Sequence, residues 1–255
     1  MSNFSKKDFI HELSFAVMKK YDEFAARVVV VEYIKNDNSR DVVTNLDREI
    51  HTLLEDMIAS KYPSIRVKSE EGDSDCSDLA DVKQMIMIDP IDGSKNYALG
   101  LPFYLTLIAY MEYGVVKGGA IVNPNNSELL IWDDSSGISN YNLTPGKTTD
   151  GPVYFAYGSD SLDFKDSTIQ NTIKAIDKHS SGFYRWGSAG SGLLELYKGN
   201  LKGFVGYEIK IWDAIPFIRL FEILEAYVHY SVQGQLLNLV ISFDREFYKE
   251  IQQII

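Results

Sequence analysis

Two aspartates three residues apart stand directly behind an apolar segment near the middle of the chain. The run Met85-Ile86-Met87-Ile88 is typical of a buried strand, and Asp89-Pro90-Ile91-Asp92-Gly93-Ser94 follows it without a break. Pro90 restrains the backbone and Gly93 permits a close approach, so the two carboxylates could converge on one point. Hard cations such as Mg²⁺ bind carboxylate oxygens. These six residues therefore predict a metal site, although by themselves they fit a plain turn equally well.

The end of the same run could bind a phosphate group. If Ser94 begins a helix, the backbone N–H groups of Gly93 and Ser94 face outward at its N-terminus, where phosphates are commonly bound. Phosphoryl transfer next to metal ions depends mainly on positioning and on charge neutralisation. It requires no Cys, His or Ser nucleophile, which suits a chain with one cysteine and four histidines.

Two further acidic positions could complete such a site. Glu70-Glu71 follows residues 64–68, a strand-like segment, and Asp213 follows Trp212 just ahead of a predicted helix. Each position also has an ordinary structural explanation. An acidic pair at a strand end is commonly a solvated edge, and an aspartate ahead of a helix is commonly its cap. The residue types alone leave both explanations open.

The charge balance argues against some classes of partner. The chain has 255 residues, with 25 Lys and Arg against 36 Asp and Glu, which gives a formal net charge of −11. We therefore expect neither nucleic acid nor an anionic membrane surface as a main partner. An acidic protein repels a phosphorylated substrate unless cations intervene, so the same balance favours bound divalent metal ions.

The sequence also supports expectations about location. Cys76 is the only cysteine, so no intramolecular disulfide can form and a reducing compartment is expected. No apolar run is long enough to span a bilayer, and the first residues lack the apolar core of a signal peptide. These features predict a soluble, cytoplasmic protein.

Helical and strand patterns alternate along the chain, which predicts an α/β fold. Helices are expected at residues 8–31, 46–61, 167–178, 191–198 and 214–225, with a last helix from Asp244. Strands are expected at residues 64–68, 85–88, 104–113, 115–122, 128–133, 153–157, 204–207, 227–232 and 236–242. Residues 36–39 are expected to form a loop, and residues 134–150, rich in small polar residues, mark a boundary. We predict two halves, residues 1–150 with most metal ligands and residues 151–255 with Asp213, in one compact catalytic unit.

Taken in order, these segments resemble the inositol monophosphatase family, within the wider superfamily of lithium-sensitive, metal-dependent phosphatases. The resemblance covers nearly the whole chain and rests on Asp41-Val42-Val43-Thr44-Asn45-Leu46-Asp47, Glu70-Glu71, Asp89 to Ser94, Asn123-Pro124, Gly187-Ser188-Ala189 and Trp212-Asp213. It implies a layered α/β/α/β/α sandwich, a homodimer, sensitivity to Li⁺, and hydrolysis of small phosphate monoesters with Mg²⁺.

The resemblance also implies roles for individual residues. Two to three Mg²⁺ ions per site would be bound by Glu70, Asp89, the Ile91 carbonyl, Asp92 and Asp213. Catalysis would depend on Glu70, Asp47 and Ser94, of which the last two would orient the attacking water. Phosphate and substrate would contact Asp92, Gly93, Ser94, Gly187, Ser188, Ala189 and Glu208. Ser94 replaces the commoner Thr and keeps its hydroxyl, whereas Asp47 could instead simply complement the helix dipole.

The substrate side departs from the family pattern. Glu208 lies five residues before Asp213, where relatives acting on inositol phosphates carry a glutamate seven residues before it, so Glu208 either reaches the substrate or faces solvent. Ile215-Pro216 follows where small residues are common. Lys95 stands where relatives acting on nucleotide bisphosphates carry a lysine, and it could contact a second phosphate or be a plain surface residue. Trp186 could stack on a sugar or a base, or belong to the core.

The leading interpretation is a Mg²⁺-dependent phosphatase for inositol monophosphate or for a sugar or polyol phosphate. Its nearest alternative acts on a nucleotide substrate, as a 3′(2′),5′-bisphosphate nucleotidase. A catalytically silent metal-binding relative and a Ca²⁺-stabilised scaffold are alternatives from other classes. The presence of every expected carboxylate, together with Asp47 and Ser94, argues against the silent protein.

Overall fold

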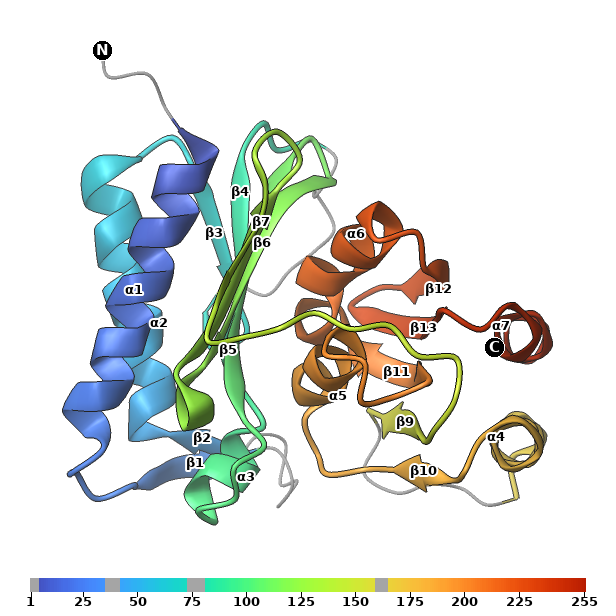
Figure 1. Cartoon of the computed structure of the whole chain (residues 1–255). Coiled ribbons are helices and arrows are strands. Elements are labelled where there is room, and N and C mark those ends of the chain that lie inside the picture. The colour runs from blue at the N-terminus through green and yellow to red at the C-terminus, as the bar shows by residue number, and fades with distance from the viewer. Residues whose placement is uncertain (1–4, 35–41, 73–80, 159–164) are drawn as a thin grey trace. The chain divides into compact units, whose positions relative to one another are not determined.

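The computed structural model describes residues 5–34, 42–72, 81–158 and 165–255. The chain divides into two compact units, Met1–Leu143 and Thr144–Ile255, whose junction lies within residues 134–150. Each unit combines helices with a β-sheet, which confirms the predicted α/β class (Figure 1). The predicted loop at residues 36–39, together with Asp41 and Cys76, lies outside the described residues.

The first unit is built on a six-stranded sheet with the strand order β3-β4-β5-β6-β7-β8. These strands are β3 (Arg66–Ser69), β4 (Met85–Asp92), β5 (Leu105–Glu112), β6 (Val115–Asn123), β7 (Glu128–Asp133) and β8 (Gly137–Tyr141). Strand β3 runs parallel to β4, and the other neighbours are antiparallel. A hairpin turn joins β5 to β6, where Tyr113 and Gly114 have φ values of 49° and 75°.

Two long helices cover one face of this sheet (Figure 1). The other elements of the unit are α1 (Lys6–Phe24), α2 (Asn45–Lys61), α3 (Ser94–Ala98), the 3₁₀ turn η2 (Pro124–Asn126), and the antiparallel pair β1 (Val31–Ile34) and β2 (Val42–Thr44). On α2, the buried residues Ile50, Leu54 and Ile58 recur every four positions, which aligns them on the face that packs into the core. The opposite face of α2 is exposed.

The first helix is shorter than the sequence predicts. We expected a helix over residues 8–31, whereas α1 ends at Phe24 and strand β1 occupies Val31–Ile34. Val28 to Val30 lie between the two elements, and the run of valines continues into β1 with Val31. β-Branched side chains lose rotamer freedom in a helix and favour extended backbone. Apolar spacing alone therefore placed the helix end too late.

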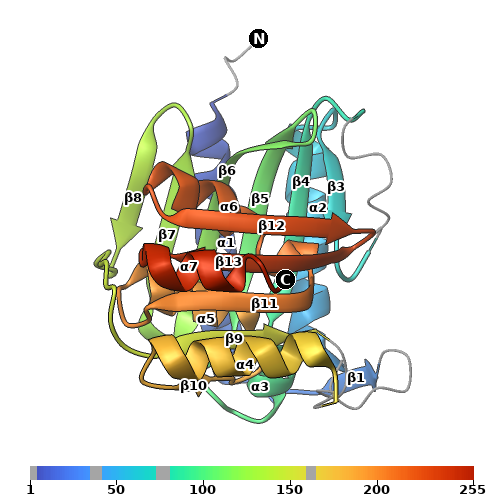
Figure 2. The same cartoon turned by 90° about the vertical axis from the view of Figure 1, so that its right-hand side faces the viewer.

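The second unit is built on a five-stranded sheet with the order β10-β9-β11-β13-β12. Its strands are β9 (Val153–Tyr157), β10 (Phe183–Tyr184), β11 (Gly203–Lys210), β12 (Tyr227–Gln233) and β13 (Leu236–Ser242). Its helices are α4 (Ser167–His179), α5 (Ala189–Tyr197), α6 (Ile215–Ile223) and α7 (Arg245–Ile251), with the 3₁₀ turn η3 (Ile211–Asp213) ahead of α6. Helices α4 and α7 cover one face of the sheet and α5 and α6 the other (Figures 1 and 2).

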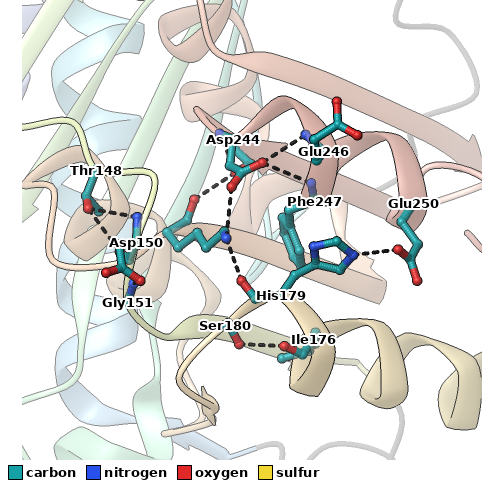
Figure 3. A network of polar contacts seen from close by, with 12 residues as sticks. Thr148, Asp150, Gly151, Ile176, His179, Ser180, Asp244, Glu246, Phe247 and Glu250 are labelled. Atoms are coloured by element: carbon teal, nitrogen blue, oxygen red, sulfur yellow. Dashed lines mark hydrogen bonds and ion pairs between the residues drawn. The ribbon is translucent and has the colours of Figure 1, made fainter.

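A polar network joins the end of α4 to the start of α7 (Figure 3). The buried Lys202 donates from Nζ to the carbonyl oxygen of His179 at 2.5 Å and pairs with Asp244 Oδ2 at 2.8 Å. Asp244 is also the N-cap of α7, because its Oδ1 accepts from the backbone N–H groups of Glu246 and Phe247. One lysine therefore holds both helices on the same face of the sheet.

Among the described helices, none combines the length and the apolar character needed to cross a bilayer.

Candidate active site

Strand β4 ends in two buried carboxylates. All eight of its residues are buried, and Asp89 and Asp92 are only 1% and 6% exposed. They offer oxygens that lie within 4.8 Å of one another. In a regular strand, residues three apart point to opposite faces of the sheet. Their convergence therefore requires an irregular strand.

A β-bulge supplies that irregularity. Asp89 pairs with Leu107 of β5 and Asp92 pairs with Leu105, so two residues of β4 stand opposite the single Thr106. Leu105 and Leu107 are two positions apart and share a face, and their partners Asp89 and Asp92 consequently share a face as well. The Thr106 hydroxyl donates to the Pro90 carbonyl oxygen at 2.6 Å, which ties down the bulge.

The paired carboxylates fit a divalent cation. Two carboxylates this close repel one another when both are ionised, and burial adds a further cost to each charge. A hard cation with oxygen ligands offsets both effects, since Mg²⁺ is typically bound by one or two carboxylates in addition to water and phosphate. The carboxylate oxygens of Asp89 and Asp92 are therefore suitable ligands for Mg²⁺.

Helix α3 begins at the predicted position, directly after β4. Gly93 precedes it with φ 89°, a left-handed conformation that favours glycine. The Ser94 hydroxyl lies within hydrogen-bond distance of two acceptors, Asp47 Oδ1 at 2.6 Å and the Ile91 carbonyl oxygen at 2.7 Å. Because a hydroxyl carries one proton, only one of these bonds can be made at a time. A phosphate at the Gly93 and Ser94 amides stays a prediction.

Asp47 links the start of α2 to the start of α3. It is 1% exposed and occupies the third helical position of a capping box: its Oδ2 accepts from the Thr44 backbone N–H at 2.8 Å and from the Thr44 hydroxyl. Its other oxygen accepts from Ser94. The two interpretations of Asp47 are thus compatible, because one carboxylate caps the helix while it contacts the predicted catalytic hydroxyl.

Burial raises the pKa of Asp47 to about 7, and the hydrogen bonds from Ser94 and Thr44 act in the opposite direction. The nearby charge of Glu71 adds to the upward shift. A carboxylate with a pKa near neutrality can exchange a proton at physiological pH, which is the property expected of a general acid–base group.

Glu70 and Glu71 occupy the turn after β3. The backbone N–H of Glu70 donates to the carbonyl oxygen of Ile88 at 3.1 Å, which places this turn beside the residue that precedes Asp89. Glu71 Oε2 accepts from the Tyr33 hydroxyl at 3.2 Å. The half-buried Glu70 is therefore a neighbour of the β4 carboxylates, and its role as a metal ligand stays a prediction.

Asp213 ends the 3₁₀ turn η3 in the second unit and is half-buried. Helix α6 starts two residues later with Ile215, and Pro216 stands in its first turn, where a missing N–H costs nothing. The bulky Ile215 is accommodated, because it is buried with an exposed fraction of 7%. These observations do not test whether Asp213 binds a metal ion, so that role stays a prediction.

The segment Gly187-Ser188-Ala189 forms the entry to α5. Ser188 is the N-cap: its Oγ accepts from the Ser191 backbone N–H at 3.1 Å and donates to Ser191 Oγ at 2.6 Å. The hydroxyl is thus engaged within the helix cap, and Ser188 is only 2% exposed. A substrate contact by this hydroxyl would compete with the cap, so the adjacent Gly187 is the more accessible part of the segment.

Glu208 sits at an irregularity of β11. The register against β13 shifts between Gly206 and Ile209, and Glu208 has φ 52°, an uncommon value for a residue other than glycine. Its backbone N–H donates to Asn238 Oδ1 at 2.9 Å, which holds this conformation. Strained backbone of this kind is often found at functional sites. The half-buried Glu208 is therefore specially placed, whereas its contact with substrate stays a prediction.

Trp186 belongs to an aromatic cluster of the second unit. Its ring lies 4.8 Å from that of Tyr154 and 5.5 Å from that of Tyr184, and its backbone N–H donates to the Tyr154 hydroxyl. The indole Nε1 is buried. The exposed ring of this cluster belongs to Tyr184. Trp186 therefore mainly packs against its aromatic neighbours.

Sequence reasoning missed two residues beside the candidate site, His51 and Ser69. The His51 ring contacts the Ser69 hydroxyl at 3.0 Å, although the two residues belong to different elements. The available signal was the spacing of His51, four residues after Asp47, which places both on one face of α2.

Comparison with known proteins gives consistent results for family and fold. The profile of the inositol monophosphatase family matches residues 7–216. Fructose-1,6-bisphosphatase/inositol-1-monophosphatase of Thermotoga maritima is 28% identical over 181 residues, which are 70% of this chain and 67% of that protein. Nus factor SuhB of Vibrio cholerae is 26% identical over 179 residues, or 69% of this chain and 66% of that protein. The chain thus matches about two thirds of the length of each relative.

A solved structure of an IMPase/NADP phosphatase complexed with Mg²⁺ and phosphate is similar to this chain with a TM-score of 0.77. The sequence identity is 18%, and the match covers 97% of this chain and 96% of that chain. The likeness shows a shared fold, and it confirms the predicted inositol monophosphatase type of α/β fold.

Proposed function

The chain belongs to the inositol monophosphatase family, and from this premise we propose that it is a Mg²⁺-dependent phosphatase of small phosphate monoesters. The observation that supports the proposal most is the pair Asp89 and Asp92, which are buried, share one face of the sheet and offer oxygens within 4.8 Å of one another. A buried acidic pair of this kind is costly without a cation.

The proposed metal ligands combine these two residues with three others. We assign Glu70, Asp89, the Ile91 carbonyl, Asp92 and Asp213 to two or three Mg²⁺ ions. The assignment of Glu70 is supported by its hydrogen bond to β4, next to Asp89. The assignment of Asp213 and the number of ions rest on the family resemblance.

Bound Mg²⁺ would supply Lewis-acid chemistry, in which it acidifies water and neutralises charge on the phosphate. The chain's own residues would orient the attacking water and the ester. When the Ser94 hydroxyl donates to Asp47 Oδ1, its lone pairs stay available to accept a hydrogen bond from that water. Asp47 can take up a proton near neutral pH because burial raises its pKa to about 7. The backbone amides of Gly93 and Ser94 would hold phosphate oxygens.

The substrate class is proposed from the relatives and from the substrate-side residues. Inositol monophosphate and sugar or polyol phosphates are the first candidates, and the Thermotoga relative is named for two such activities. A nucleotide substrate is the alternative, supported by Lys95 and by the name IMPase/NADP phosphatase of a protein with this fold. Gly187, Ser188, Ala189 and the strained Glu208 are the proposed determinants of this choice.

The proposal includes four further features that were expected from the sequence. These are the homodimer, the cytoplasmic location, the sensitivity to Li⁺ and the absence of a nucleic-acid partner. The relative named Nus factor SuhB is not named as a phosphatase. A protein that binds metal but has no phosphatase activity is therefore the alternative that the first experiment must address.

Phosphate release would be measured with Mg²⁺ from inositol 1-phosphate, fructose 1,6-bisphosphate, adenosine 3′,5′-bisphosphate and NADP. We expect activity on at least one substrate, loss of that activity with EDTA, and inhibition by Li⁺. The Asp89→Asn variant should lose more than about 100-fold in kcat/KM, because removing a direct ligand should exceed the 10–100-fold cost of disturbing an outer partner.

Asp177→Asn is the matched control, since Asp177 is an exposed aspartate on α4. It should behave like the parent protein. Equal turnover by Asp89→Asn and the parent would refute the metal mechanism, and inactivity on all four substrates together with tight Mg²⁺ binding would favour the silent relative. Activity confined to adenosine 3′,5′-bisphosphate or NADP would select the nucleotide substrate.

A further inference from the structure

One face of α2 contacts residues at or just beyond the ends of the neighbouring strands β3 and β4. Asp47, His51 and Glu55 are spaced four residues apart and therefore lie along one face of the helix. Asp47 contacts Ser94, just beyond β4, and His51 contacts Ser69, the last residue of β3. The helix thus holds two segments that contain predicted metal or catalytic residues.

The His51 side chain is enclosed by polar partners at both ring nitrogens. Nδ1 lies 3.0 Å from Ser69 Oγ, Nε2 lies 3.2 Å from Glu55 Oε2, and the side chain is 15% exposed. The Glu71 backbone N–H donates to the same Ser69 Oγ at 3.4 Å. The protons available allow a continuous chain of hydrogen bonds. In this chain the Glu71 N–H donates to Ser69 Oγ, the Ser69 hydroxyl donates to His51 Nδ1, and His51 Nε2–H donates to Glu55.

The ring also packs directly against the turn that contains Glu70. The Gly72 N–H donates to the Ser69 carbonyl oxygen at 3.1 Å and closes this turn. A Cβ atom placed on Gly72 would lie 2.7 Å from His51 Cε1 and 3.3 Å from Nε2. Only a residue without a side chain allows the backbone to approach the imidazole this closely.

The turn is therefore supported from two sides. On one side the Glu70 backbone N–H is bonded to Ile88 of β4, and on the other side Ser69 and Gly72 rest against His51 of α2. Removing the imidazole leaves the β4 side in place and removes the α2 side. The expected consequence is a less well defined position of the Glu70 carboxylate, without loss of the strand that precedes it.

We propose that His51 is a positioning residue, which sets the affinity of the site for divalent cations by fixing the Glu70–Glu71 turn through Ser69. The inference rests on the proposed function, because it takes Glu70 as a metal ligand. His51 touches neither substrate nor metal in this proposal. Outer partners that orient metal ligands commonly change metal affinity by 10–100-fold when they are removed.

The test is calorimetric titration of the metal-free, full-length protein with Mg²⁺, together with steady-state kinetics over a range of Mg²⁺ concentrations. His51→Ala should raise the Kd for Mg²⁺ by about tenfold. Its kcat at saturating Mg²⁺ should stay within about twofold of the parent value, since orientation is restored once the ion is bound. His51→Asn should recover most of the affinity, because its amide can reach the position of Nδ1 and bond Ser69.

Ser69→Ala removes the hydroxyl that His51 contacts, and so tests the same contact from its other partner. It should resemble His51→Ala, and the double variant should be no weaker in metal affinity than either single one, as expected for residues that act as one unit. This second variant keeps the proposal testable if His51→Ala folds poorly. His11→Ala is the matched control, because His11 lies on α1 beside Phe15 and Tyr141 and should leave Mg²⁺ affinity unchanged.

The outcomes separate this inference from the proposed function. If Asp89→Asn loses Mg²⁺ binding while His51→Ala and Ser69→Ala bind Mg²⁺ like the parent, the metal site stands and the role of His51 is wrong. A lower Tm with unchanged affinity would likewise reduce His51 to a structural residue. If Asp89→Asn binds Mg²⁺ as tightly as the parent, the proposed metal site is wrong and this inference falls with it.

Discussion

Asp47 should make the stability of the metal-free protein depend on pH in a direction unusual for an aspartate. Burial raises its pKa from 3.8 to about 7, so the folded state binds this proton more tightly than the unfolded state. The contribution to stability is fully present below about pH 4 and is lost as the pH rises toward about 7. Replacing Asp47 by Asn, which does not titrate, should remove this dependence.

The size of the effect follows from the pKa difference. A shift of about three units corresponds to about 4 kcal/mol, at 1.36 kcal/mol per unit. Part of that is already lost at pH 5, where the unfolded carboxyl is ionised. Between pH 5 and pH 8 the parent protein should therefore lose about 2–3 kcal/mol through this one group. Asp47→Asn should lack that loss, although a constant offset from altered hydrogen bonds to Thr44 and Ser94 is expected.

The measurement is urea unfolding of parent and Asp47→Asn between pH 4 and pH 8, with EDTA present to exclude metal ions. The informative quantity is the difference between the two free energies of unfolding, since other titrating groups cancel. Asp56→Asn, an exposed aspartate of the same helix, serves as the matched control. If the curves of parent and Asp47→Asn run parallel over this range, the pKa of Asp47 is not raised and the reasoning is refuted.

Two further predictions concern the second unit. Lys202→Met removes the cation that joins α4 to α7, and urea unfolding should show a loss of about 2–3 kcal/mol in stability. This is somewhat less than for a fully buried ion pair, because Asp244 is partly exposed. The control Lys178→Met, at a side chain that is 63% exposed, should cost less than about 1 kcal/mol. Gly158→Ala would place a Cβ atom 1.8 Å from the Glu208 carbonyl oxygen, a backbone atom that cannot rotate away, and should cost about 1–3 kcal/mol. A Gly158→Ala protein with the parent's Tm would show that the β11 irregularity at Glu208 is not fixed as described.

The sequence predicted best those features that are local along the chain. The apolar run before Asp89 and the helix start at Ser94 each depend on neighbouring residues, and each lies where the pattern indicated. The helix predicted to reach Val31 failed for a related reason. The apolar residues at helical spacing were followed directly by the β-branched run Val28 to Val31. A periodic apolar pattern does not show where a helix ends and a strand begins.

The contacts between distant segments were beyond sequence reasoning. His51 and Ser69 are 18 positions apart and belong to a helix and a strand, so no local pattern joins them. The left-handed backbone of Glu208 is likewise invisible, because it depends on a bulge against β13 and on the amide of Asn238. Such features depend on tertiary packing, which local sequence patterns do not reveal.

The bulge in β4 makes the number of residues between the two aspartates matter as much as their identity. An insertion of one residue between Asp89 and Asp92 would enlarge the bulge or move Asp92 past Leu105 and turn its carboxylate to the other face of the sheet. A deletion of one residue would restore a regular strand with both carboxylates on one face, but it would remove the Pro90 carbonyl that binds Thr106 or the Ile91 carbonyl that lies beside Ser94. Substitutions at Ile91 that keep the length leave the backbone carbonyl in place. We therefore expect this segment to accept changes of side chain more readily than changes of length, so that the spacing itself is the more stringent constraint on any engineered or natural variant.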